Sequence, residues 1–268
     1  MQNIILTAFA ATVCTWLMTA LGAATVGIFR NRNRRAMNAM LGFAAGVMVA
    51  ASFWSLLEPA IESAERYLTA PSWLVAVSGF LLGAGFMWLC DRIVRRMGKN
   101  TLADGATENT QSLSRASLLV ISITLHNIPE GMAVGVAFGA IGQSANPHEA
   151  LMAAISVAVG IGIQNFPEGA AVSVPLRREG LSAKKSFLIG QATALVEPVA
   201  GVLGAALVIH IQTMLPYALA FAAGAMILVA VHELIPQAQE GRTEGGFLST
   251  MGIVCGFATM MLLDVALG

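Results

Sequence analysis

Long apolar segments recur along the whole chain, and this feature limits the folds open to it more than any other. They are separated by short polar stretches, and about 20 consecutive apolar residues are enough for a helix to cross the hydrocarbon core of a bilayer. Only 11% of the 268 residues are charged, whereas a soluble domain has about 25%. The sequence therefore predicts an all-α, polytopic membrane protein.

The apolar pattern predicts eight spans in a single transmembrane domain, 1–268. The expected spans cover residues 3–29, 37–60, 72–94, 115–141, 150–176, 184–209, 215–238 and 246–267. The longest connection, 95–114, is rich in polar residues and glycine, so we predict a flexible cytoplasmic linker there. The first apolar run is followed by arginines, the reverse of the charge order in a cleaved signal peptide, and is expected to remain as a span.

The basic residues predict the orientation of the chain in the membrane. Of the 15 Lys and Arg residues, all but Arg66 fall in or beside the odd-numbered connections. Because cytoplasmic loops of membrane proteins carry the excess of Lys and Arg, these connections are expected in the cytoplasm. We therefore predict a multi-pass protein of the cell (inner) membrane with both termini extracytoplasmic.

Two similar runs lie inside the fourth and fifth predicted spans and have the form (His/Gln)-Asn-x-Pro-Glu-Gly. The first is His126–Gly131 and the second is Gln164–Gly169. Positions four apart share a helix face, so His126 and Glu130 form one pair of ligands for a divalent cation, and Gln164 and Glu168 form another. The proline in each run removes a backbone hydrogen bond, which predicts a kinked or broken helix of the kind that transporters use at substrate sites.

Glu197, in the sixth predicted span, is expected at the same depth as Glu130 and Glu168, near the middle of the membrane. A carboxylate in hydrocarbon is costly unless it is neutralised, and no Lys or Arg is predicted at this depth. The alternatives are three protonated glutamates that bond to neighbouring helices, or a cation held among them. The imidazole and amide groups beside them favour the cation.

The types of ligand limit the ion. Imidazole, carboxylate and amide groups without a thiolate favour Zn²⁺, Fe²⁺, Mn²⁺ or Cd²⁺ over Cu⁺. Asn127 and Asn165 each lie one residue along from a primary ligand, where they would either serve a second, adjacent ion or bond across helices. The three cysteines form no metal or disulfide pattern and are expected to pack in the spans.

Further polar residues near the ends of the spans are candidates for a route to and from the central site. His232 and Glu233 are expected near the cytoplasmic end of the seventh span, and Asp264 near the outer end of the eighth. Each is equally well read as an interfacial polar residue. From the residues alone, Met48 in the second span is expected to serve in packing.

The two HNIPEG and QNFPEG runs, together with Glu197-Pro198, strongly resemble the ZIP (Zrt/Irt-like) metal transporters, most closely their GufA-like branch. The resemblance covers nearly the whole chain. It implies that the first and last three helices are related by pseudo-symmetry around helices 4 and 5, and that a binuclear metal centre lies at the midplane. The residues that it places in the first metal site are His126, Glu130, Gln164 and Glu168. Those that it places in the second are Asn127, Asn165, Glu168 and Glu197, with Glu130 also bridging.

The same resemblance implies that ions enter past Asp264 and Met48 and leave past His232 and Glu233. Asn165 stands where some ZIP proteins carry an acidic residue, which predicts a less negative second site. Residues 95–114 contain no histidine, unlike the cytoplasmic loop of many relatives.

These features together predict a transporter that moves Zn²⁺, and also Cd²⁺, Fe²⁺, Mn²⁺ or Co²⁺, into the cytoplasm. The expected partners are the ions as substrates and the lipid bilayer, with a homodimer left open and neither a cofactor nor nucleic acid. The alternatives are a passive metal channel, a proton-coupled carrier of an organic solute, or an intramembrane metalloenzyme. A zinc protease is disfavoured because His232-Glu233 lacks the second histidine of His-Glu-x-x-His.

Overall fold

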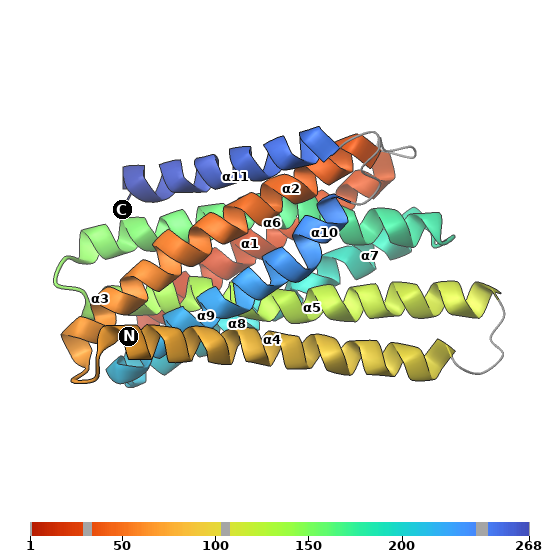
Figure 1. Cartoon of the computed structure of the whole chain (residues 1–268). Helices are drawn as coiled ribbons and strands as arrows, with labels where there is room; N and C mark the ends of the chain where they lie inside the picture. The colour runs from red at the N-terminus through yellow and green to blue at the C-terminus, as the bar shows by residue number, and fades with distance from the viewer. Residues whose placement is uncertain (1, 29–33, 103–107, 240–245, 268) are drawn as a thin grey trace.

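The computed structural model describes residues 2–28, 34–102, 108–239 and 246–267. Every regular element in this part of the chain is helical, and 8 segments are long and apolar enough to cross a membrane. These segments lie side by side in one elongated bundle (Figure 1). The prediction of an all-α polytopic fold with eight spans is confirmed.

Five spans are each built on one long α-helix, and three are interrupted. The five are α1 (Gln2–Ile28), α4 (Ser72–Leu102), α5 (Glu108–Ala140), α6 (Pro147–Arg178) and α11 (Gly246–Leu267). The second span consists of α2 (Arg34–Ala51), the π-helical segment η1 (Ser52–Leu57) and α3 (Glu58–Tyr67). The sixth consists of α7 (Ala183–Ala192), the 3₁₀ turn η3 (Thr193–Leu195) and α8 (Val196–His210). The seventh consists of α9 (Leu215–Val229), the π-helical segment η5 (Ala230–Leu234) and α10 (Ile235–Ala238).

Several predicted boundaries need correction. The second span continues to Tyr67 rather than ending at residue 60. The region 95–114 is not a linker throughout, because α4 continues to Leu102 and α5 begins at Glu108; only 103–107 lie outside the described residues. A helix satisfies its own backbone hydrogen bonds, so it can continue into water after its apolar residues end.

The motif prolines do not break their helices. Pro129 and Pro167 both lie inside continuous α-helices, α5 and α6. The wider π-helical turns occur instead in the second and seventh spans, and each ends shortly before a proline, Pro59 or Pro236. A π turn is an irregularity often found at functional sites.

Helices pack in four main pairs: α2 with α11, α1 with α6, α5 with α8, and α4 with α9. The pairing of the second span with the eighth thus corresponds to the pairing of the seventh with the third. In the same way, the pairing of the first span with the fifth corresponds to that of the sixth with the fourth. This agrees with the expected pseudo-symmetry of the first and last three spans. Glycines allow the close approach in each pair, because an added Cβ would collide with the backbone of the partner helix. Examples, at least one from each pair, are Gly22, Gly42, Gly46, Gly83, Gly131, Gly169, Gly224 and Gly256.

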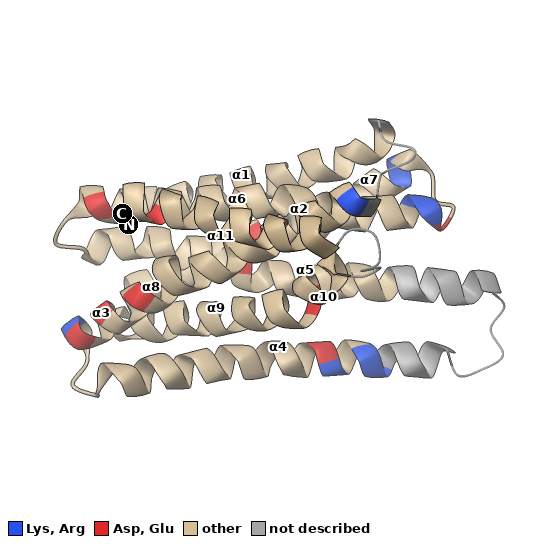
Figure 2. Ribbon diagram, turned by 45° about the horizontal axis from the view of Figure 1, so that its top comes forward, with Lys and Arg blue, Asp and Glu red and all other residues tan. Residues whose placement is uncertain are grey.

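Charged residues are sorted between the two ends of the bundle (Figure 2). We call the end that carries most of the described Lys and Arg residues the basic end. Its basic residues include Arg35, Arg92, Arg95, Arg96, Arg177, Arg178, Lys184 and Lys185. Arg66, in the last turn of α3, lies at the opposite end, where both termini also lie (Figures 1 and 2).

Candidate metal site

Glu130 of α5 and Gln164 of α6 meet in the middle of the bundle. The Gln164 Nε2 atom donates a hydrogen bond of 2.8 Å to Glu130 Oε1, and both side chains are at most 1% exposed. The other oxygen of each side chain, Glu130 Oε2 and Gln164 Oε1, is buried and has no hydrogen-bond partner among the described residues. Each of these two side chains therefore has one oxygen acceptor that no donor in the described part of the chain satisfies.

Glu197 of α8, next to this pair, is more fully bonded. Asn165 Nδ2 donates to Glu197 Oε1 over 2.8 Å and to the carbonyl of Thr15 over 3.2 Å. The Thr15 hydroxyl of α1 donates to the second oxygen, Glu197 Oε2. Because both partners of the Asn165 amide are acceptors, they fix which side is the nitrogen, and Asn165 Oδ1 is left without a donor.

Gly131 is the reason that α8 can bring Glu197 so close to α5. A Cβ at this position would lie 2.5 Å from the Cα atom of Glu197, well inside the normal carbon–carbon contact distance of about 3.5 Å. The glycine that closes the first motif therefore sets the distance between the two helices that carry Glu130 and Glu197.

Asn127 adds another acceptor without a donor. Its side chain is 1% exposed, and neither of its polar atoms has a partner in the described part of the chain. Four buried amide and carboxylate oxygens in the two motifs are thus unsatisfied among the described residues, which is unusual because more than about 90% of buried polar groups find a partner. They are Asn127 Oδ1, Glu130 Oε2, Gln164 Oε1 and Asn165 Oδ1. A surplus of acceptors over donors is what a bound cation relieves.

His126 and Glu168 lie on the side of this centre that faces the basic end. They line a small cavity of about 10 Å³ together with Glu233 of η5. His126 Nε2 lies 3.1 Å from Glu233 Oε1, and the Ser122 hydroxyl lies 3.3 Å from Glu233 Oε2. His126 therefore points toward Glu233, so the first-site residues are not assembled around one point. Consistent with this, the described residues hold no group of three or more His, Cys, Asp or Glu side chains positioned to bind a metal.

His232, next to Glu233, belongs to a cluster nearer the surface of the basic end. Its Nε2 atom lies 3.5 Å from Asp91 Oδ2 of α4 and 3.1 Å from a guanidinium nitrogen of Arg95. Asp91 was not among the residues singled out from the sequence, where it reads as an acidic residue at the end of an apolar segment.

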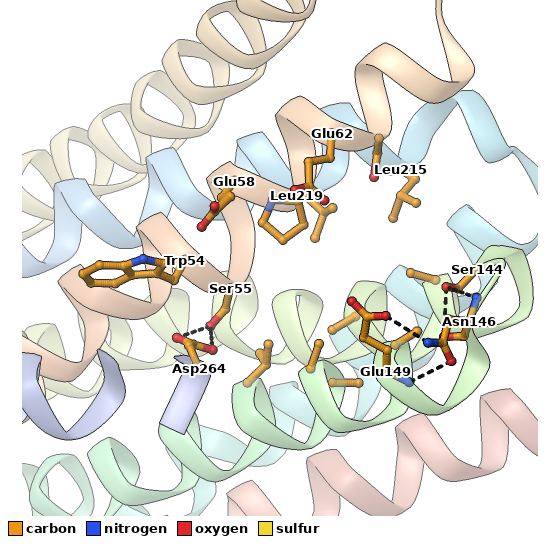
Figure 3. Close-up of a pocket in the computed structure, with 18 of the residues that line it drawn as sticks. Trp54, Ser55, Glu58, Glu62, Ser144, Asn146, Glu149, Leu215, Leu219 and Asp264 are labelled. Carbon is orange, nitrogen blue, oxygen red and sulfur yellow. Dashed lines mark hydrogen bonds between the residues drawn. The ribbon is translucent and has the colours of Figure 1, made fainter. Parts of the chain in front are cut away.

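Asp264 lies at the opposite end, at the edge of a cavity of about 730 Å³. It accepts hydrogen bonds of 2.8 Å from Ser55 of η1 and from Ser156 of α6. Glu58, Glu62 and Glu149 also line this cavity, and the labelled side chains approach it from separate helices (Figure 3).

Apolar side chains separate this cavity from the central polar groups. The cavity reaches Val157 on α6, two turns before Gln164, and Ile161 lies between them with no exposed surface. Met48 is also fully buried in the hydrophobic core, which agrees with the packing role expected from the residues alone.

Eight candidate membrane spans around a set of buried oxygens without donors define a polytopic membrane protein, and comparison with known proteins adds the family. Residues 99–264 match the family model described as ZIP zinc transporter. The chain is 38% identical to zinc transporter ZIP11 of Xenopus tropicalis, over 98% of each chain. It is 35% identical to zinc transporter GufA of Myxococcus xanthus, over 93% of this chain and 94% of that one. It is 36% identical to zinc transporter ZIPB of Bordetella bronchiseptica, over 93% of this chain and 78% of that one.

The chain belongs to the ZIP zinc transporter family. The resemblance expected from the two motifs is confirmed, and with it the broad class of divalent metal-ion transport across a membrane.

Proposed function

We propose that this protein carries Zn²⁺, and related divalent ions such as Cd²⁺, Fe²⁺, Mn²⁺ and Co²⁺, from outside the cell into the cytoplasm. The observation that carries the proposal is the set of buried oxygens without donors on α5 and α6. The names of the relatives support zinc, and the ligand types suit Zn²⁺ and similar ions.

In this proposal the first ion is held by His126, Glu130, Gln164 and Glu168. Its binding requires His126 to turn from Glu233 toward Glu130, a change that one side-chain rotation can begin. A second position lies beside the first and uses Asn127, Asn165 and Glu197, with Glu130 and Glu168 bridging. Glu197 already accepts hydrogen bonds on both oxygens, so this second position is expected to bind more weakly.

The proposed route runs from the acidic cavity to the basic end. Asp264, with Glu58 and Glu62 nearby, attracts cations to the cavity, because acidic residues in a cleft raise the local cation concentration. The ion then crosses the apolar layer around Met48 to the central ligands and leaves past Glu233 and His232. The sorting of Lys and Arg to the other end supports a cytoplasmic position for that end.

Uptake of ¹⁰⁹Cd²⁺ into proteoliposomes tests the proposal, with wild type compared to Glu130→Gln. Glutamine keeps the size of the side chain and removes its charge. A suitable control is Glu65→Gln, an exposed residue whose hydrogen bond within the described residues is with Ser72. We expect uptake by wild type and by the control, and its loss in Glu130→Gln. Binding of metal by wild type with no flux would contradict transport and favour the metalloenzyme alternative.

A second assay separates a carrier from a passive channel. Vesicles loaded with unlabelled Cd²⁺ should accumulate ¹⁰⁹Cd²⁺ transiently above equilibrium, because a carrier exchanges ions through one site that faces each side in turn. With the membrane potential held at zero by valinomycin and equal K⁺ on both sides, a channel gives no such overshoot.

A further inference from the structure

At the basic end, Arg95 contacts a carboxylate and an imidazole, the two kinds of side chain best suited to bind a metal ion there. Its Nε atom donates to both oxygens of Asp91, over 2.8 and 2.7 Å, and its terminal nitrogen lies 3.1 Å from His232 Nε2. A guanidinium can only donate hydrogen bonds. His232 Nε2 is therefore the acceptor, and its lone pair, the one that a metal would use, faces Arg95.

The distance between the two acceptors supports this assignment. His232 Nε2 and Asp91 Oδ2 are 3.5 Å apart, and as acceptors they do not bond to each other. Two ligands of a tetrahedral ion, with metal–ligand distances near 2.1 Å, are separated by about 3.4 Å. The guanidinium thus bridges a carboxylate and an imidazole whose spacing suits a divalent cation.

Asp264 at the other end provides an internal comparison. Gly79 and Gly83 precede Asp91 by the same spacing with which Gly252 and Gly256 precede Asp264, and each helix packs through these glycines on its partner. Asp264 accepts its hydrogen bonds from the neutral hydroxyls of Ser55 and Ser156. The carboxylate near the proposed entrance thus has no cationic partner among the described residues, whereas Asp91 is paired with Arg95.

We propose that the Arg95 guanidinium competes with the metal for Asp91 and His232. A divalent ion must then displace the guanidinium from these two side chains as it leaves the protein. This inference rests on the proposed function, which supplies the ion and its direction. The displacement is feasible because the Arg95 side chain is 60% exposed and the Asp91 side chain only 13%, so the arginine can move into water while the carboxylate stays. A simple (i, i+4) ion pair along α4 would not account for the third contact, which reaches His232 in the seventh span.

Binding of ¹⁰⁹Cd²⁺ to the purified full-length protein, measured by equilibrium dialysis, tests the inference. Arg95→Gln is compared with Arg92→Gln, because Arg92 lies on the same helix and stacks over Trp88, with its Cζ atom 5.1 Å from the ring centroid. We expect the Asp91–His232 site of Arg95→Gln to bind Cd²⁺ about tenfold more tightly than the same site of the wild type, since a positive charge and its hydrogen bonds are removed. The gain should disappear in Arg95→Gln with Asp91→Asn, and Arg92→Gln should match wild type.

Arg95→Lys provides a second test that does not depend on the folding of the glutamine variant. Lysine keeps the charge but has no fork to bridge two acceptors, so we expect an intermediate gain. Unchanged Cd²⁺ binding in both Arg95 variants, with the central ion still bound, would overturn this inference alone. Absence of any bound Cd²⁺ in wild type would overturn the proposed function with it.

Discussion

Gly131→Ala is the substitution whose effect follows most directly from the structure. The added Cβ would lie 2.5 Å from the Glu197 Cα atom, about 1 Å closer than carbon atoms normally approach. To relieve the collision, α8 has to move away from α5 by about 1 Å. This movement also displaces Glu197 relative to Asn165 of α6 and distorts the hydrogen bond between them, now 2.8 Å.

The stability change can be worked out from these steps. Overpacking costs about 1–3 kcal/mol, and a buried carboxylate oxygen without its donor costs about 1–3 kcal/mol more. Alanine recovers about 1 kcal/mol through its higher helix propensity. We therefore expect a net loss of about 1–5 kcal/mol in the free energy of unfolding, or several degrees in Tm.

Thermal unfolding of the detergent-solubilised protein, monitored by size-exclusion chromatography, measures this loss of stability. Cd²⁺ binding measures the effect on the site. Gly85→Ala is the matched control, because nothing lies within 4 Å of the Cβ that it adds. The control should keep or slightly raise the Tm and bind Cd²⁺ as wild type does. If Gly131→Ala has the Tm of the control and binds Cd²⁺ normally, the close approach of α5 and α8 does not build the site.

Three further substitutions test other parts of the account. Thr15→Val should lower stability by about 1–3 kcal/mol by leaving Glu197 Oε2 without its donor, and Thr15→Ser should restore the Tm; equal Tm values for the two would contradict the role of the hydroxyl. Gln164→Leu should weaken Cd²⁺ binding by about tenfold or more, because it removes an unsatisfied oxygen. Isothermal titration compares it with Gln191→Leu, which changes a half-buried glutamine of α7 that bonds to Trp16, and equal affinities of the two variants would contradict a ligand role for Gln164. Asp264→Asn should slow uptake mainly at low Cd²⁺ concentrations, since it removes an attracting charge at the outer cavity; an equal slowing at saturating Cd²⁺ would argue against an entrance role.

Much of the fold could be predicted because the bilayer imposes a simple rule on sequence. Spans must be long and apolar, and the eight runs of this chain show that pattern clearly. Motif spacing and depth also indicated that Glu130, Gln164, Asn165 and Glu197 belong to one buried region, and the structure joins them in two hydrogen-bonded pairs.

The remaining features depend on which helices touch. Lipid-facing helices are apolar on most sides, so the pairing of α2 with α11 leaves little periodic signal. No motif in the sequence marks Thr15, Ser55 or Asp91. Each becomes important only because another helix brings a polar partner against it, and these partners are Glu197, Asp264 and His232 respectively. The π turns η1 and η5 likewise could not be located from the prolines alone. Some prolines follow a π turn, whereas those of the two motifs lie inside the continuous helices α5 and α6.

The position of the bound ion decides whether Glu130 and Gln164 hold the metal. Crystals of the protein grown with Cd²⁺ would show it in an anomalous difference map. We predict a peak within bonding distance of Glu130 Oε2 and Gln164 Oε1, with His126 turned away from Glu233 to join them. Peaks confined to the surface, with the Gln164–Glu130 and His126–Glu233 contacts unchanged in saturating Cd²⁺, would contradict it.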